Sequence, residues 1–264
     1  TTARIGASVW GNCTKGTNGN NRIVSWSATT TGFEVQAALH SSSLLVLDEM
    51  GEAEKEQIIQ YIYSLSDSKG KTRGQADITL RPSQTWKLLA CSTGEFNIKG
   101  HIGLTRNLPT GVLMRMLEIP VDTGDGCGAL EGMTDKKDRK AFMEQLDAAL
   151  RANYGVACRP YLEHLTALLK QPEELQALRD AHSEITNQFS HNGTNQHSRA
   201  AKVFAALALG GMIATQQGLT GWPENHALAV AQKAFNRWRV GFGEGVKEQS
   251  TFIEHLEGWL SHNG

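Results

Sequence analysis

The sequence has few of the features that assign a chain to a specialised class of protein. It contains only 4 cysteines in 264 residues, and no two of them form a CxxC pair, which argues against both a disulfide framework and a zinc site and predicts a reducing, cytoplasmic setting. No apolar run approaches the length that spans a bilayer. The formal net charge of −1 gives no overall field that attracts nucleic acid, so any such binding requires a local basic patch.

What is present predicts an α/β protein. Short apolar strands alternate with helices in the first 120 or so residues, and this alternation is typical of a parallel sheet with helices on both faces. The predicted strands are Arg22 to Trp26, Leu44 to Leu47, Trp86 to Cys91 and Met114 to Ile119. The predicted helices are Thr1 to Trp10, Phe33 to His40 and Glu54 to Leu65.

Strand signals end at a glycine-rich segment, residues 121 to 132, and the remainder predicts helices. These are Lys136 to Asn153, Pro160 to Leu169, Pro172 to Phe189, Ser198 to Gln217, Glu224 to Phe242 and Glu248 to His262. We therefore expect an α/β domain over residues 1–132 and a helical domain over residues 133–264. The first residues, TTARIGASVWG, begin in the middle of a helical pattern, so we also expect the chain to be a fragment of something longer.

Paired acids follow the second predicted strand. In SSSLLVLDEMGEAEKEQ, the aliphatic run Leu44 to Leu47 leads directly into Asp48 and Glu49. At the carboxyl end of a parallel strand, the first acid can hold Mg²⁺ and the second can activate a water for attack on a γ-phosphate. The alternative is that these acids only begin a polar loop.

A basic loop separates these acids from the next strand. Lys69, Lys71 and Arg73 lie in a glycine-bearing segment that predicts either a solvated turn or a hairpin that grips a nucleic-acid backbone. The strand after it ends in Ser92 and Thr93, whose hydroxyls can reach the same phosphate as Glu49.

Arg115 lies inside an apolar run, GVLMRMLEIPVD, where a guanidinium is costly unless it reaches a partner or the edge of the sheet. This position predicts one of two roles. Arg115 is either structural, with a buried ion pair or a side chain that reaches solvent, or it stabilises a transferring phosphate across a subunit interface.

Taken together, these segments resemble a known family. The order VSWSATTTGFEVQAALHSSSLLVLDEMGEA, GKTRG, WKLLACSTGE and RMLEIPVD, with SRAAKVFAALALGGMIATQQGLTGWPE in the helical part, is similar to the domain of unknown function 927 family of phage and mobile-element helicases, some of them inactivated. That family resembles the hexameric superfamily-three helicases, whose core is an AAA+-like P-loop NTPase.

The resemblance implies a fold that lacks its first strand and its Walker A phosphate loop, and a chain that starts just after the Walker A lysine. It also implies ATP and Mg²⁺ as cofactors, single-stranded DNA as a partner, no membrane, and a homo-oligomeric ring, possibly of six subunits in the parent. The residues to which it gives roles are Thr1 and Asp48 for Mg²⁺, Thr1, Thr2, Asp48 and Arg199 for the nucleotide, Glu49, Ser92, Thr93 and Arg115 for hydrolysis, and Lys69, Lys71 and Arg73 for DNA.

The sequence favours two functions, and it leaves open a third, a different P-loop enzyme such as a signalling ATPase or a defence NTPase. One is an ATP-driven helicase or primase-helicase of a phage or mobile element. This chain would then be an inactive fragment that binds ATP weakly or not at all, because the loop that supplies most of the grip on the phosphates is absent from it. The other is a catalytically inactive AAA+-like module that binds DNA or assembles with partners. The Ser92–Thr93 pair favours the second function, since the related viral helicases carry asparagine there, and the intact Asp48 and Glu49 favour the first.

Overall fold

The computed structural model describes residues 2–14, 22–74, 80–102, 108–122, 124 and 126–243. The chain divides into two compact units, one made of residues 1–108 and 122–160 and the other of residues 109–121 and 161–264. The sequence analysis puts its single boundary after residue 132, whereas in this division residues 133–160 lie in the same unit as the strands.

The first unit contains a parallel sheet of three described strands, β1 (Ile23–Ser25), β2 (Leu44–Asp48) and β5 (Leu89–Ser92), in the order β1-β2-β5. The register pairs Ser25 with Asp48 and Leu47 with Ser92, so the three strands end at one edge of the sheet. The α/β class is confirmed, as are three of the four predicted strands.

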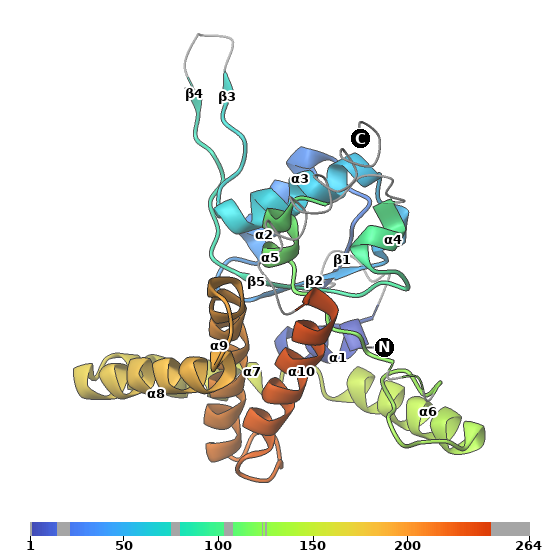
Figure 1. The fold of residues 1–264 in the computed structure, drawn as a ribbon, viewed down its shortest axis with the longest axis vertical. Helices are drawn as coiled ribbons and strands as arrows, with labels where there is room; N and C mark the ends of the chain where they lie inside the picture. The colour runs from blue at the N-terminus through green and yellow to red at the C-terminus, as the bar shows by residue number, and fades with distance from the viewer. Residues whose placement is uncertain are drawn as a thin grey trace, which may run out of the picture. The chain divides into compact units, whose positions relative to one another are not determined.

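Helices cover both faces of this sheet, because β2 is apolar on both sides. Helix α1 (Thr2–Trp10) packs on one face, where its Ala3 and Ala7 form a buried cluster with Val46. Leu45 and Leu47 alternate with Val46 and are fully buried on the opposite face. Helices α2 (Thr30–Leu39) and α3 (Lys55–Asp67) lie on that side (Figure 1).

Three aromatic side chains join α2 and α3 to the end of β1. Phe33 and Tyr61 stack with ring centroids 4.0 Å apart, and Trp26 stacks on both at 6.2 and 6.4 Å. All three are almost fully buried, and packed rings of this kind hold two helices in a fixed position.

The basic loop of the sequence forms an antiparallel hairpin. Its strands are β3 (Arg73–Gly74) and β4 (Leu80–Arg81), and a bridge between Lys69 and Thr85 extends the pairing toward the sheet. Figure 1 shows the hairpin projecting away from α2 and the sheet.

The glycine-rich segment leads into α6 (Lys136–Ala152), which packs on α1. Asp135 begins this helix by accepting hydrogen bonds from the backbone N–H groups of Lys137 and Asp138, as N-cap residues do. Leu150 joins the buried cluster of Ala3 and Ala7 on α1. Two short helices complete the described part of this unit, η1 (Met50–Glu52) and α4 (Ile98–Ile102).

Helices make up the described part of the second unit. They are α5 (Thr110–Arg115), α8 (Pro172–Ser190), α9 (Asn195–Gln216), α10 (His226–Phe242) and most of α7 (Cys158–Leu169). α9 packs against both α8 and α10, and rings from all three fill the interface, namely Phe189, Phe204, Phe235 and Trp238. The predicted helices from Lys136 to Phe242 are confirmed, and the one from Glu248 to His262 lies outside the described residues.

The predicted strand from Met114 to Ile119 is wrong. Thr110–Arg115 forms α5, which begins after Pro109 and buries Val112 and Leu113. Apolar residues spaced for one face of a single helical turn resemble a short apolar strand, and the contact of α5 with α9 favours the helix.

Among the described helices, none is both long and apolar enough to cross a membrane.

Candidate functional site

The candidate site lies at the edge where the parallel strands end. Asp48 is the last residue of β2, and the next residue after the neighbouring strand β5 is Thr93. The backbone N–H of Thr93 donates to the carbonyl oxygen of Leu47 over 3.1 Å, and its hydroxyl donates to the Asp48 carboxylate. The sequence analysis places these two residues on neighbouring strand ends, and in the structure they are in direct contact.

Ser92 has a different environment from Thr93. Its hydroxyl oxygen accepts a hydrogen bond of 2.9 Å from the indole N–H of Trp26, whose ring is 1% exposed. A buried indole N–H without an acceptor is costly. The geometry therefore gives Ser92 a packing role and leaves Thr93 as the hydroxyl beside Asp48.

Glu49 occupies a backbone conformation that few non-glycine residues adopt. Its φ of 59° and ψ of 59° place it in the left-handed region immediately before η1, and its side chain is exposed. This conformation costs roughly 1 kcal/mol for a residue with a Cβ atom. It turns the chain sharply after β2, so that Glu49 does not continue the strand.

Two further polar residues at this edge were missed by the sequence analysis. Ser25 ends β1 opposite Asp48, and its hydroxyl donates to the Glu52 carboxylate over 3.1 Å. The available signal was the position of Ser25 at the end of the first strand, because the ends of parallel strands share one edge.

Helix α1 begins on the same side of the sheet. After α1 the chain returns beside the start of β1, where the backbone N–H of Arg22 donates to Asn12 over 3.0 Å. The segment that follows α1 therefore lies at the start of β1, which is the end of this strand away from Asp48. Thr2 is the first residue of α1, and Thr1 lies outside the described residues.

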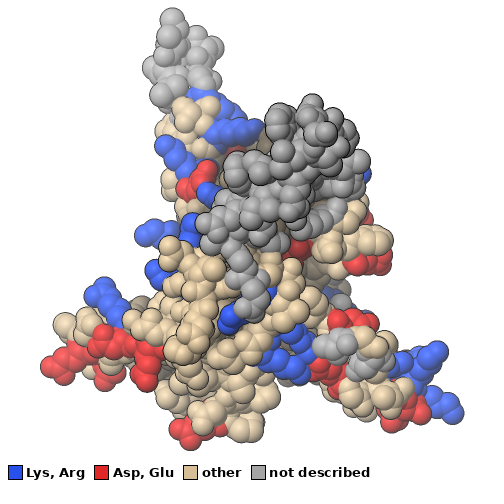
Figure 2. Space-filling view, in the orientation of Figure 1, with Lys and Arg blue, Asp and Glu red and all other residues tan. Residues whose placement is uncertain are grey.

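The hairpin carries the three basic residues that the sequence analysis singles out. Figure 2 shows Lys and Arg side chains gathered along its described base. Lys69 and Lys71 are exposed, whereas Arg73 is half-buried. Arg73 forms an ion pair of 2.6 Å with Glu34 of α2.

Glu34 is a carboxylate buried to 1% exposure. It accepts hydrogen bonds from the Arg73 guanidinium over 2.6 and 3.1 Å and from the Lys71 backbone N–H over 3.0 Å. Burial by itself raises the pKa of Glu34, but the hydrogen bonds from Arg73 and Lys71 and their positive charges outweigh it, so the pKa lies below its ordinary value. Sequence reasoning missed Glu34, because one acid within a helix carries no signal.

Arg115 and Arg199 belong to the other unit. Arg115 is exposed at the end of α5, where it donates to the carbonyl oxygen of Gly111 over 3.1 Å. It is therefore not a guanidinium buried within a strand. Arg199 is exposed near the start of α9.

The oxygen atoms at the strand edge suit Mg²⁺. This ion keeps several waters and takes only one or two protein carboxylates or hydroxyls beside the phosphates of its nucleotide. Asp48 supplies such a carboxylate, and the hydroxyl of its neighbour Thr93 donates to it. Clusters of three or more His, Cys, Asp or Glu that would suit a metal held wholly by protein do not occur in the described part of the chain.

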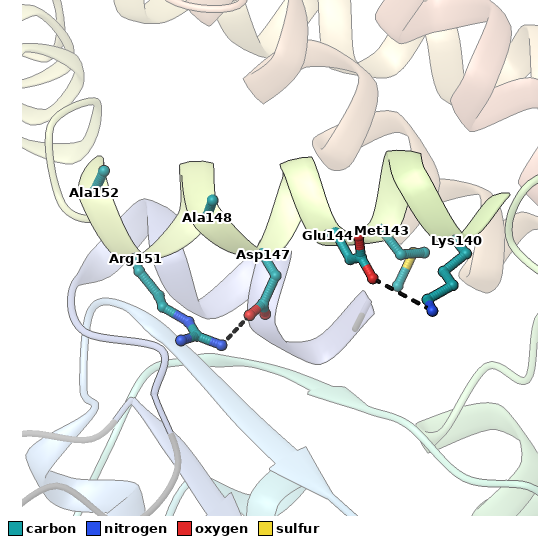
Figure 3. Close-up of a pocket in the computed structure, with 7 residues that line it drawn as sticks. All are labelled: Lys140, Met143, Glu144, Asp147, Ala148, Arg151 and Ala152. Carbon is teal, nitrogen blue, oxygen red and sulfur yellow. Dashed lines mark hydrogen bonds and ion pairs between the residues drawn. The ribbon is translucent and has the colours of Figure 1, made fainter. Parts of the chain in front are cut away.

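A hollow runs along α6 and is lined by Lys140, Met143, Glu144, Asp147, Ala148, Arg151 and Ala152. Figure 3 shows that its charges pair along the helix, Arg151 with Asp147 and Lys140 with Glu144. Asp147 also accepts a hydrogen bond from Arg4 of α1. Asp147 thus stabilises the contact between α6 and α1. The hollow is therefore a weaker candidate site than the strand edge.

Comparison with solved structures shows a similar fold in a protein named "SCCmec type IV Cch - active helicase". The two structures align with a TM-score of 0.57 and 19% sequence identity, over 89% of this chain and 38% of that chain. The chain therefore spans well under half the length of this structural relative. A search among curated proteins found no match.

The family comparison agrees with the resemblance seen in the motifs. Residues 1–85 match the model described as "Domain of unknown function (DUF927)", a stretch that contains α1, Asp48, Glu49 and the basic hairpin. The first 85 residues of the chain are therefore similar to the DUF927 family.

Proposed function

We propose that the parent protein is an ATP-dependent DNA helicase or primase-helicase of a phage or other mobile element, and that this chain supplies part of its AAA+-like ATPase core. The observation that carries the proposal is the contact between Asp48 at the end of β2 and Thr93 after β5, with Glu49 immediately following. The likeness in fold to a protein named as an active helicase supports it.

Each residue at the edge has a role in this proposal. Asp48 holds Mg²⁺ together with the hydroxyl of Thr1, and Thr93 fixes the orientation of the Asp48 carboxylate. Glu49 orients the attacking water and accepts its proton. A Mg²⁺ held by Asp48 and Thr1 would supply the positive charge that neutralises the β- and γ-phosphates of ATP. Thr2 and Arg199 contact the nucleotide.

The proposed enzyme works as a ring, because Arg115 acts on the ATP of a neighbouring subunit. Its exposed position at the end of α5 is compatible with a contact to another chain. Lys69 and Lys71 of the hairpin bind the phosphates of single-stranded DNA, since exposed lysines on a projecting segment can follow a flexible backbone.

The test is DNA-stimulated ATP hydrolysis by the full-length protein. Glu49→Gln should lower kcat by about 10²- to 10⁴-fold, because a carboxamide cannot accept the proton. Glu56→Gln, a change of another exposed glutamate on α3, is the matched control and should leave kcat unchanged. Normal hydrolysis by the Glu49→Gln variant would show that the site is wrongly assigned.

The ring is tested by mixing two inactive variants. A Glu49→Gln subunit retains Arg115, and an Arg115→Ala subunit retains Glu49, so a mixed ring contains some interfaces with both groups intact. Mixing should restore part of the ATPase activity. If the mixture stays as inactive as its components, Arg115 does not act between subunits.

An inactive DNA-binding module is the second candidate function, and the replacement of asparagine by Ser92–Thr93 at the strand end favours it. Under this alternative the full-length protein binds DNA through Lys69 and Lys71 but hydrolyses no ATP. Filter binding together with the ATPase assay separates the two functions.

A further inference from the structure

We propose that Glu34 fixes the direction of the hairpin through Arg73, so that Arg73 is a positioning residue and the phosphate contacts belong to Lys69 and Lys71. This inference rests on the proposed function for its DNA-binding part. Its structural part, the attachment of the hairpin to α2, stands independently.

The contact between Glu34 and the hairpin uses both carboxylate oxygens. Arg73 Nη1 donates to Oε2 over 2.6 Å, and Arg73 Nη2 donates to Oε1 over 3.1 Å. The Lys71 backbone N–H also donates to Oε1, over 3.0 Å. A two-pronged pair of this kind fixes orientation as well as distance, which a single charged contact does not.

The close approach of the hairpin to Glu34 depends on a glycine. A Cβ atom at Gly70 would lie 2.7 Å from Glu34 Oε2, which is closer than a carbon and an oxygen can pack. The backbone of Gly70 is in turn paired with the other arm of the hairpin, since its N–H donates to Gln84 over 2.8 Å. The arm that lies against the Glu34 carboxylate is therefore also held to the other arm of the hairpin.

Glu34 itself is held rigidly. Its neighbour Phe33 stacks on Tyr61 and Trp26, and Trp26 donates to Ser92, the residue before Thr93. The hairpin is thus fastened to the same packed block that supports the end of β5. A movement of the strand ends that carry Asp48 and Thr93 would therefore be transmitted to the hairpin through these packed side chains.

The charges of the three basic residues are not equivalent. Both terminal nitrogens of Arg73 donate to Glu34, so a carboxylate already balances the positive charge of this guanidinium. The ammonium group of Lys71 donates to the uncharged Gln60 Oε1 over 3.2 Å, and Lys69 is exposed. The two lysines are accordingly the cations that phosphate can reach without breaking an ion pair.

The first experiment measures the affinity of the full-length protein for an oligo-dT strand as a function of salt. Each phosphate contact contributes a slope of about 0.7 in log Kd against log salt for single strands. Lys71→Ala should reduce the slope by about 0.7, whereas Arg73→Ala should weaken binding and leave the slope unchanged. A slope reduced by Arg73→Ala as much as by Lys71→Ala would overturn the assignment of Arg73.

The effect of Glu34→Gln on DNA affinity depends on whether Arg73 positions the hairpin or binds phosphate itself. If Glu34 positions the hairpin, its loss weakens DNA binding by about tenfold, the cost of ordering a loosened segment on binding. If Arg73 binds phosphate directly, the same change frees a guanidinium and strengthens binding. Glu56→Gln is the matched control. Arg73→Lys should fail to restore binding, because lysine keeps the charge but not the two-pronged geometry.

Gly70→Ala provides a variant that changes no charge. Its added methyl group should push the hairpin away from Glu34 and weaken DNA binding with an unchanged salt slope, as Glu34→Gln does. Binding as tight as that of the unaltered protein would contradict the close packing on which the proposal depends.

Hydrogen exchange at the Lys71 amide tests the attachment without DNA. This amide donates to Glu34, so Glu34→Gln should increase its exchange rate, while amides in the centre of α9 remain unchanged. Unchanged exchange at Lys71 overturns the positioning role. Increased exchange in a protein that binds no DNA leaves the positioning role intact and rejects the proposed function.

Discussion

The different roles of Ser92 and Thr93 lead to a prediction that separates stability from catalysis. Ser92→Ala removes the acceptor of the Trp26 indole N–H, a hydrogen bond of 2.9 Å. Because the Trp26 ring is 1% exposed, water cannot easily replace that acceptor. We expect a loss of about 1–3 kcal/mol in the free energy of unfolding, the usual cost of an unsatisfied buried donor, and little change in kcat.

Thr93→Val should have the reverse effect. It keeps the shape of the side chain but removes the hydroxyl that donates to Asp48. Loss of a group that orients a metal-binding carboxylate commonly reduces activity by about 10- to 100-fold. Thr93→Ser retains the hydroxyl and is the control, which should keep most of the activity.

Urea unfolding and DNA-stimulated ATPase assays on the same set of variants provide the measurements. A double-mutant cycle with Trp26→Phe and Ser92→Ala should give a coupling energy of about 1 kcal/mol, because both changes break one hydrogen bond. The reasoning is refuted if Ser92→Ala unfolds at the same urea concentration as the unaltered protein but hydrolyses ATP slowly, while Thr93→Val is fully active.

Three other predictions concern stability. Glu49→Asn should raise the free energy of unfolding by up to about 1 kcal/mol while abolishing hydrolysis, because asparagine tolerates the left-handed backbone; a lower unfolding midpoint would contradict this. Leu150→Ala should lower the free energy of unfolding by about 2–4 kcal/mol, because it leaves a cavity between α6 and α1. The Lys140 side chain is 79% exposed, so the control Lys140→Ala should change this free energy by less than about 0.5 kcal/mol. Because the pKa of Glu34 lies below its ordinary value of 4.5, the stability it contributes is complete above that pH and is lost as the pH falls through the lowered value. Unfolding curves of Glu34→Gln should lack this part of the acid dependence, and identical pH profiles would refute it.

The strand β2 was predicted correctly from its apolar run. Leu45, Val46 and Leu47 are all buried, and a strand that is covered on both faces appears in the sequence as an unbroken apolar run. The run around Arg115 looked similar but forms α5, because Val112 and Leu113 are buried in contact with a helical unit. A short apolar run does not by itself distinguish a strand from a helical turn.

The basic hairpin was one of the two structures predicted for this segment. The different roles of Arg73 and the two lysines were not predicted. Lys69, Lys71 and Arg73 are close in sequence and have the same charge. Their difference arises from Glu34, which is separated from Arg73 by 39 residues. No local pattern reports such a contact.

The sequence by itself determined the α/β class, the helical second half and the position of Asp48 and Glu49 at a strand end, because these depend on local periodicity and on which residues follow a buried strand. Only the tertiary structure decided that Thr93 rather than Ser92 contacts Asp48, that α6 packs on α1, and that Arg73 is paired with Glu34. These depend on contacts between residues far apart in the chain, and such contacts are set by how the elements pack rather than by the order of neighbouring residues.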